Sequence, residues 1–186
     1  MLIEHGYSRV VTANGLEFTF TPSFARIAQL GHPGEIVDAF RGLFGPRALF
    51  NARYVLAVLC DQDDATALLG WQDEDGEHEG NMPVLEQISL AAHLMRHGLV
   101  GSGGTRQDGS SPVTQFHVAE YVAAARIHLG LSTADAEALS MSEFQALFEM
   151  KYPQSKSPKR DVPTREEYRA AMEAIERRRD GQNLAI

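Results

Sequence analysis

The chain has 186 residues, of which 44% are hydrophobic and 23% charged, values typical of a soluble globular protein with its own core. Its 25 Asp and Glu residues outnumber its 17 Lys and Arg residues and give a formal net charge of −8, which repels phosphate and excludes nucleic acid as an expected partner. The single cysteine, Cys60, excludes an intramolecular disulfide and a thiolate zinc cage, and it is predicted to be a buried apolar side chain.

The first predicted element is a β-hairpin over residues 7–21. Two β-rich runs flank an Asn-Gly pair at residues 14–15, the strongest short-range signal of a hairpin turn. Leu16, Phe18 and Phe20 alternate with polar residues, so one face of the ribbon is apolar. Because a lone hairpin is only marginally stable, this face is predicted to pack on helices.

From Thr21 onward the hydrophobic spacing becomes helical. Thr21 is predicted to cap the first helix, with Pro22 at its first position and Gly31 after its end. Further helices are predicted over residues 33–43, 47–60, 83–97 and 113–129, with a short helical turn around Ala67 and Leu68. The helix over 83–97 is predicted to end at Gly98 and to turn Val84, Ile88, Ala91 and Met95 to the core.

Two segments between these helices are predicted to be loops. Residues 73–80 are acidic and punctuated by glycine, and residues 101–111 are rich in Gly and Ser. The acidic segment does not match a calcium-binding EF-hand loop, because placing Gly76 at the sixth position of the loop puts Trp71 at the first, where it cannot ligate. The Gly-Ser-Gly-Gly run at 101–104 lacks the Lys-Ser ending of a phosphate-binding loop.

The segment HLGLSTADAEALSMSEFQALFEMKYP, residues 128–153, carries the most specific helical signals. Ser132 and Asp135 predict a capped start for a short helix. Ser140 and Glu143 form a capping box for a second helix, which stops before Pro153. Beyond it lie a linker interrupted by prolines and a final charged helix.

Together these elements predict an α+β, predominantly α-helical fold. An N-terminal β-hairpin packs on a helical domain, and a C-terminal helix is semi-independent. The expected organisation is a hairpin plus helical domain over residues 1–152, a linker over 153–163, and a C-terminal helix and tail over 164–186.

Two histidines, His93 and His97, are the candidate metal ligands. They lie four residues apart on a predicted helix, so both imidazoles can reach one metal. However, no third ligand is identified, Leu94 stands where a catalytic Glu would follow His93, and histidine near a helix C-terminus also complements the helix dipole. No Gly-x-Ser-x-Gly elbow occurs. We therefore expect no catalytic residue, no metal and no cofactor; a small metal-dependent enzyme using this pair is kept as an alternative.

Apolar side chains on the last two predicted helices are candidates for contact with a partner protein. Such a stripe is more often part of a core, so both roles are left open for them. The candidate partner-binding residues are Phe144, Leu147, Phe148, Tyr152, Tyr168, Met172 and Ile175.

Several of these features together resemble a known family. The helix ending in Leu-Gly at 129–130 and the following MSEFQALFEMKYP helix look like the C-terminal part of tail assembly chaperone-like proteins, from the tail-gene modules of long-tailed bacteriophages. The IEHG opening at 3–6, the TPSF segment at 21–24 and the TREEY segment at 164–168 are similar to the start and end of that family. Residues 61–80 carry no resemblance.

The resemblance implies a non-enzymatic chaperone that holds the phage tape-measure protein soluble during tail morphogenesis. The implied partner is the tape-measure protein, with the major tail protein as a further candidate and a homo-oligomer left open. A structural virion component, such as a tail or head-completion protein, is the alternative. The N-terminus lacks a secretory signal and no apolar run approaches the roughly 20 residues of a membrane span, so a protein of the host-cell cytoplasm is expected.

Overall fold

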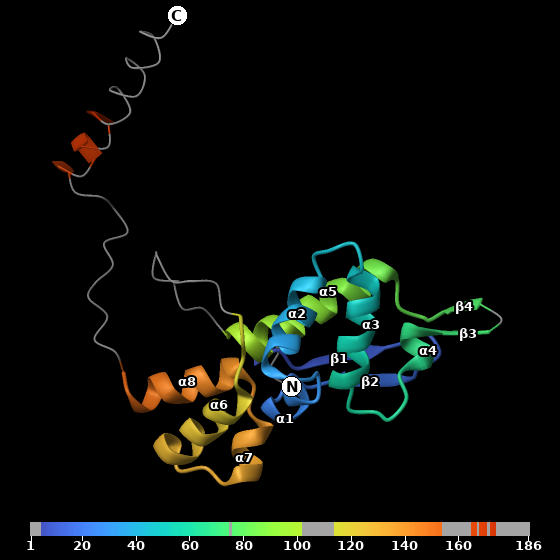
Figure 1. Ribbon diagram of the computed structural model, residues 1–186, viewed down its shortest axis with the longest axis horizontal. Helices are drawn as coiled ribbons and strands as arrows, with labels where there is room; N and C mark the ends of the chain where they lie inside the picture. Colours follow the sequence, from blue (N-terminus) through green and yellow to red (C-terminus); the bar gives the residue numbers. More distant parts are fainter. Residues whose placement is uncertain are drawn as a thin grey trace, which may run out of the picture. The chain divides into compact units, whose positions relative to one another are not determined.

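A computed structural model describes residues 5–74, 76–101, 114–153, 165–166, 168–170 and 172–173 of the chain (Figure 1). The chain divides into two units, Met1–Pro153 and Gln154–Ile186. In the second unit, all the described residues are helical. The predicted linker therefore lies outside the described residues, apart from Pro153.

The N-terminal hairpin is confirmed. β1 (Ser8–Val11) pairs antiparallel with β2 (Glu17–Phe20), so that Val10 lies opposite Phe18. Phe18 and Phe20 are buried, and Phe20 also forms a β-bridge with Cys60. The apolar face of the ribbon thus packs on the helices, as the alternation of side chains predicts.

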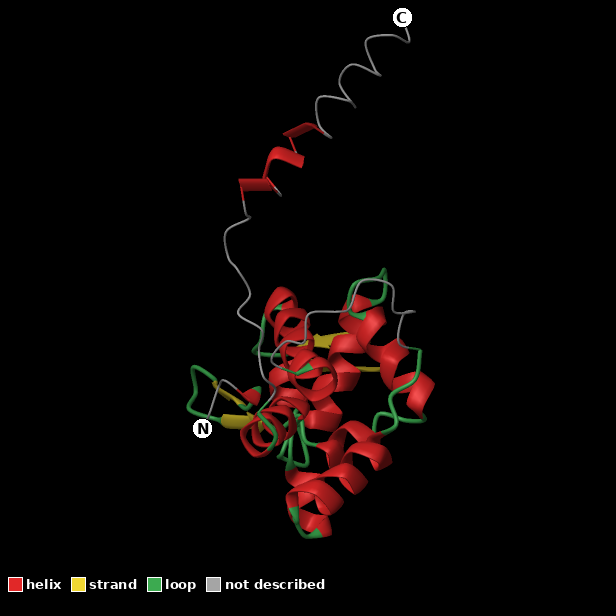
Figure 2. Ribbon diagram, turned by 90° about the vertical axis from the view of Figure 1, so that its left-hand side faces the viewer, coloured by secondary structure: helices red, strands yellow, loops and turns green. Residues whose placement is uncertain are grey.

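Helices make up most of the first unit (Figure 2). They are α1 (Phe24–Ala28), α2 (Pro33–Gly42), α3 (Ala48–Leu59), α4 (Thr66–Leu69), α5 (Val84–Met95), α6 (Val118–Ala124), α7 (Thr133–Ala138) and α8 (Met141–Lys151). α5 and α6 each continue into a π-helical turn, η2 (Arg96–Val100) and η3 (Ala125–Leu129). α3 packs along α5, while α8 packs against both π-helical turns. The prediction of a mostly helical α+β fold is confirmed.

Serine caps begin three of the helices. Ser132 accepts from the N–H of Asp135 at 3.1 Å, and Ser140 and Glu143 form the predicted capping box. The prediction for α1 is wrong, because Ser23 and not Thr21 caps it, accepting from the N–H of Arg26 at 3.3 Å.

The predicted boundaries of the two long helices need correction. Gly98 does not end its helix, which continues as η2 to Val100. Gly98 packs closely against α1, since a Cβ atom at this position would lie 2.7 Å from Cδ1 of Ile27. α6 begins at Val118, five residues later than predicted. Gly98 thus serves close packing, not helix termination.

The buried face of α5 also differs from the prediction. Val84 is exposed, whereas Gln87 is buried. The Gln87 amide donates to the carbonyls of Leu69 at 3.2 Å and Met82 at 2.8 Å. A polar side chain can occupy the core here because these two acceptors satisfy its donors.

The acidic segment over residues 73–80 forms a second hairpin, so the prediction of a loop is wrong. β3 (Gly70–Asp73) pairs antiparallel with β4 (Gly76–Glu79), and the rings of Trp71 and His78 stack with centroids 4.6 Å apart. Gly70 has φ +79°, and a Cβ there would lie 2.3 Å from the His78 carbonyl oxygen. Only glycine fits this backbone, which allows the strands to pair. The predicted Gly/Ser-rich loop lies outside the described residues beyond Gly101.

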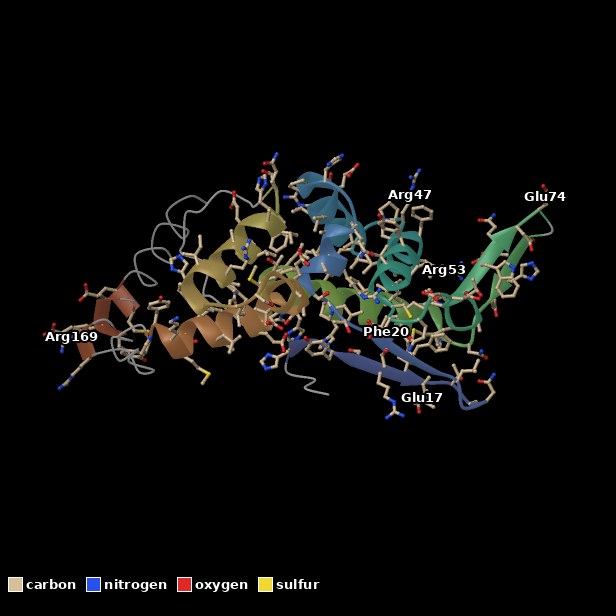
Figure 3. The ribbon with its side chains drawn as sticks, turned by 90° about the horizontal axis from the view of Figure 1, so that it is seen from below. Glu17, Phe20, Arg47, Arg53, Glu74 and Arg169 are labelled. Carbon is tan, nitrogen blue, oxygen red and sulfur yellow. The ribbon has the colours of Figure 1, made fainter. Side chains whose placement is uncertain are left out.

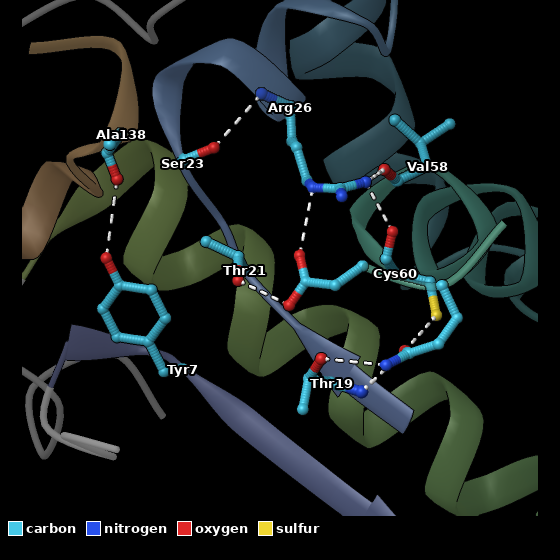
Figure 4. A network of polar contacts seen from close by, with 10 residues as sticks. Tyr7, Thr19, Thr21, Ser23, Arg26, Val58, Cys60 and Ala138 are labelled. Carbon is cyan, nitrogen blue, oxygen red and sulfur yellow. Dashed lines mark hydrogen bonds and ion pairs between the residues drawn. The ribbon is translucent and has the colours of Figure 1, made fainter. Parts of the chain in front are cut away.

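Arg26 joins three elements in a polar network (Figure 4). Its guanidinium donates to the carbonyl oxygens of Val58, at 3.2 Å, and Cys60, at the C-terminal end of α3. It also pairs with Asp61 at 3.2 Å, and the other carboxylate oxygen of Asp61 accepts from the Thr21 hydroxyl at 2.9 Å. A positive charge at this helix end complements the helix dipole and satisfies carbonyls that no helical N–H reaches.

The start of the first unit is tied to its last helix. The Tyr7 hydroxyl donates to Glu143 Oε2 at 2.7 Å and lies 3.5 Å from the Ala138 carbonyl oxygen. Burial and this carboxylate raise the pKa of Tyr7. The N–H of Phe24 donates to the Leu139 carbonyl at 2.8 Å. Within the described residues, no helix is both long and apolar enough to cross a bilayer.

Candidate protein-binding surface

Stacked aromatic rings connect the core of the first unit to its surface. Buried Phe24 of α1 stacks on Tyr121 of α6, with centroids 5.8 Å apart, and meets Phe144 of α8 edge to face at 6.1 Å. The contacts continue along α8 from Phe144 to Phe148 at 5.7 Å and from Phe148 to Tyr152 at 5.0 Å. We call these five residues the aromatic ladder. It joins α1, α6 and α8 and ends in a partly exposed ring.

The predicted partner-binding residues of α8 have two different environments. Phe144 is a core residue, and Phe148 is partly buried against the core. Leu147 and Tyr152 are exposed by 39% and 44%, and Met150, which the sequence interpretation missed, by 80%. Met150 follows Leu147 by three residues, a helical spacing that places the two side by side. The exposed apolar edge of α8 therefore consists of Leu147 and Met150, with Tyr152 at the end of the helix.

Tyr152 is exposed but already has contacts within its own unit. Its hydroxyl donates to the His128 carbonyl at 3.4 Å, and its ring meets the His128 ring with centroids 6.3 Å apart. The His128 ring also lies 5.9 Å from the ring of Phe148. These contacts fix the end of α8 against η3, so a partner would meet a preformed surface.

An open groove of about 420 Å³ runs between α1, α6 and α7. Phe24 belongs both to its lining and to the aromatic ladder. Most of the lining is small or apolar, and Arg126, Thr133 and Glu137 add polar groups. The apolar lining residues are Phe24, Ala25, Ala28, Val118, Ala119, Val122 and Ala123. Small side chains leave room for another helix to approach the backbone, and an amphipathic helix is the typical ligand of such a groove.

The sequence interpretation missed this groove. The alanines of α1 stand three apart, at 25 and 28, and those of α6 four apart, at 119 and 123. Each pair therefore lies on one helix face, a signal visible in the sequence. The sequence does not show that these two helix faces lie next to each other, because the helices are about 90 residues apart along the chain.

In the second unit, the candidate residues are described only in part. Tyr168 and Met172 are exposed by 60% and 41% and lie four residues apart on a helix, so they share a face. Ile175 lies outside the described residues.

The candidate metal ligands are brought together, but His97 has another partner. The rings of His93 and His97 lie 4.6 Å apart between centroids. His97 Nδ1 is 2.7 Å from the hydroxyl of Ser142, a buried residue in the first turn of α8. No group of three His, Cys, Asp or Glu side chains suited to a metal occurs within the described parts of the chain. The geometry thus gives His97 a role in anchoring α8.

Acidification is expected to destabilise the fold through His97. Burial first, then the charges of His93, Arg96 and His5, lowers the pKa of His97 below its usual 6.5. Below pH 6.5 the unfolded chain therefore binds more protons at His97 than the folded chain does. The contribution of neutral His97 to the free energy of unfolding is present above pH 6.5 and is lost as the pH falls through the lowered pKa of the folded state. The ring is partly exposed, so the slope should be only a fraction of the roughly 1.4 kcal/mol per pH unit of one fully linked proton.

The measurement is the free energy of unfolding in urea between pH 7 and pH 5. The His97→Gln variant, which keeps a hydrogen-bonding group near Ser142, should show a shallower loss than the unchanged protein. His117→Gln, at an exposed position before α6, serves as the control and should keep the original slope. Equal slopes in all three proteins would contradict the assignment to His97.

Cys60 is buried and free, as predicted. Its thiol donates to Gln62 Oε1 at 3.3 Å, and burial raises its pKa. A raised pKa keeps the side chain in the thiol form, which is the less reactive one. Cys60 is therefore a structural residue at the end of α3.

The fold and its surfaces define a small, predominantly helical α+β protein, with an apolar groove and an exposed apolar helix edge at one end of the first unit. The chain belongs to a family of unknown function, DUF6246, whose model matches residues 41–170. This match includes α3 to α8 and therefore the α6 and α7 sides of the groove. No curated protein matches the chain. No solved structure matches it either.

Proposed function

We propose that this protein is a non-enzymatic tail assembly chaperone, which binds the tape-measure protein of a long-tailed bacteriophage in the host-cell cytoplasm during tail morphogenesis. The observation that supports the proposal best is the apolar groove between α1, α6 and α7. Tape-measure chains are long and helical with apolar faces, and such a face would self-associate unless a partner covers it. The sequence features shared with tail assembly chaperone-like proteins support the same function.

The groove suits transient binding of a helix. Its lining of alanine and valine offers apolar contact with few bulky anchors, and its open side lets a bound helix leave again. The exposed edge of α8, Leu147 and Met150, gives a second apolar contact in the same group of helices (Figure 1). A chaperone must release its client to the assembling tail tube, so a shallow apolar surface fits the function better than a deep one.

The test is co-expression with the tape-measure protein of the tail-gene module to which this chain would belong. The chaperone should raise the soluble fraction of the tape-measure protein and co-purify with it. Ala123→Glu places a charge in the groove at an exposed helix position, and we expect it to weaken co-purification about tenfold because a bound apolar helix would remove water from the new carboxylate. Ala57→Glu, the same change at an exposed position of α3, is the matched control and should bind as before.

Two outcomes would contradict the proposal. One is unchanged solubility of the tape-measure protein with no complex. The other outcome is that the Ala123→Glu variant, the Ala57→Glu control and a Leu147→Ser, Met150→Ser double variant all bind the tape-measure protein equally well. Neither the groove nor the exposed edge of α8 would then be the binding surface. Retention of the protein in purified virions would instead support the alternative, a structural tail or head-completion component.

A further inference from the structure

A second group of exposed apolar side chains lies at the corner between α2 and α3. Phe44 and Phe50 are exposed by 72% and 71%, and Tyr54 is exposed one turn further along α3. Phe44 meets the partly buried ring of Phe40 edge to face at 5.6 Å, which holds it in place. We call Phe44, Phe50 and Arg47 between them the α2–α3 corner. Large aromatic rings held in solvent are typical of contact sites and not of ordinary surface.

The charge of this corner is opposite to that of the whole chain. Arg47 is exposed and lies between the two phenylalanines in the sequence, on a protein with a net charge of −8, whereas Arg41 pairs with Asp38 at 3.6 Å. A complementary partner should therefore present an aromatic or apolar side chain together with carboxylates.

The chain itself carries such a complement on the β3–β4 hairpin. Trp71 is partly exposed and stacks on His78, which fixes its ring. Glu74 lies exposed in the turn of the hairpin and supplies a carboxylate beyond the Trp71 ring. The hairpin projects from the helices on the side away from α6, α7 and α8 (Figure 1). One salt bridge, between Arg53 of α3 and Glu77 at 2.7 Å, secures it to the body of the unit.

The two surfaces do not meet within one molecule. Figure 3 shows Arg47 at the edge of the helical body and Glu74 at the far end of the hairpin, with both side chains directed outward. Contact between them therefore requires two molecules.

We propose that the α2–α3 corner of one molecule binds the β3–β4 hairpin of a second copy of this chain. Phe44 and Phe50 contact the Trp71 ring, while Arg47 pairs with the carboxylate of Glu74. Because the two surfaces are different, the contact is head to tail, and the growing assembly keeps one free corner at one end and one free hairpin at the other until it closes into a ring. This inference is independent of the tape-measure interaction, which uses the opposite end of the unit.

Self-association is measured by sedimentation velocity over a range of protein and salt concentrations. The unchanged protein should form oligomers at high concentration, and added salt should weaken them because exposed charge pairs are screened. Arg47→Glu and Glu74→Lys should each weaken association at least about tenfold by placing like charges together. The double variant that carries both changes should recover it.

A mixing experiment distinguishes head-to-tail contact from a symmetric one. Phe50→Ser removes an anchor of the corner and Trp71→Ser removes the aromatic ring of the hairpin, so each of these variants keeps one intact surface. An equimolar mixture of the two should therefore form a one-to-one dimer that grows no further. Phe50→Ser by itself should abolish association, whereas Ile127→Ser, at a position 76% exposed on η3, should not. A protein that stays monomeric up to about 1 mM, or a mixture that stays monomeric while the unchanged protein associates, would overturn the proposal.

Discussion

Replacement of Phe24 by alanine is expected to lower the free energy of unfolding by about 4 kcal/mol, the largest single effect that we predict. Phe24 is fully buried and touches the rings of Tyr121 and Phe144. Its loss removes buried apolar area, breaks two aromatic contacts and leaves a cavity where α1, α6 and α8 meet. The neighbouring backbone is held by the hydrogen bond to Leu139, so the helices cannot close the cavity completely.

The measurement is urea unfolding followed by circular dichroism. Phe50→Ala is the matched control, because the same side chain is removed from a position that is 71% exposed, and the change should stay within about 0.5 kcal/mol. A loss below about 1 kcal/mol for Phe24→Ala would show that the aromatic ladder does not hold the helices together.

The second large effect is expected for Arg26→Ala, about 3 kcal/mol. The guanidinium of Arg26 donates hydrogen bonds to carbonyl groups at the C-terminal end of α3 and also pairs with the Asp61 carboxylate. Its removal leaves Asp61 with the Thr21 hydroxyl alone and leaves the Val58 and Cys60 carbonyls without this donor. A partly buried carboxylate that loses its cation costs more than an exposed pair, which explains the size of the effect.

The lysine variant separates charge from geometry. Arg26→Lys keeps the positive charge but cannot reach two carbonyls and a carboxylate with one planar group, so it should fall between the alanine variant and the unchanged protein. Arg9→Ala, which breaks an exposed pair with Glu17, should cost at most about 0.5 kcal/mol. Equal losses for Arg26→Ala and Arg9→Ala in thermal or urea unfolding would refute the role of the network.

Local signals explain which parts of the fold could be predicted from the sequence. The Asn-Gly turn, the Ser132 cap and the capping box of Ser140 with Glu143 each depend on residues within four positions of one another. The chain alone therefore determines them, and each was found at its predicted place.

The elements that were mispredicted depend on distant partners. The β3–β4 hairpin has few β-forming residues; the Trp71 and His78 stack and the Arg53 salt bridge stabilise it, and neither is visible as a pattern. Gln87 is buried because two carbonyls outside its helix accept from it. A polar residue in a helical pattern is assigned to solvent unless those acceptors are known.

The candidate site shows the same division. The apolar stripe of α8 was identified from its spacing, but spacing does not tell that Phe144 is core while Leu147 is surface. That distinction is set by α1 and α6, which cover one side of the stripe and leave the other open. The groove is assembled from three helices, so it becomes visible only in three dimensions.

The contact of Tyr7 with Glu143 has a consequence for biosynthesis. The two residues are 136 positions apart, and a ribosome adds about 5–20 residues per second, so the first hairpin and α1 wait on the order of 10 s for the helix that completes them. Until Leu139 and α8 have been synthesised, the apolar side chains of α1 that pack against them remain exposed to solvent. Within this unit, the hairpin and α1 are thus translated before α8 but reach their final packing only after it.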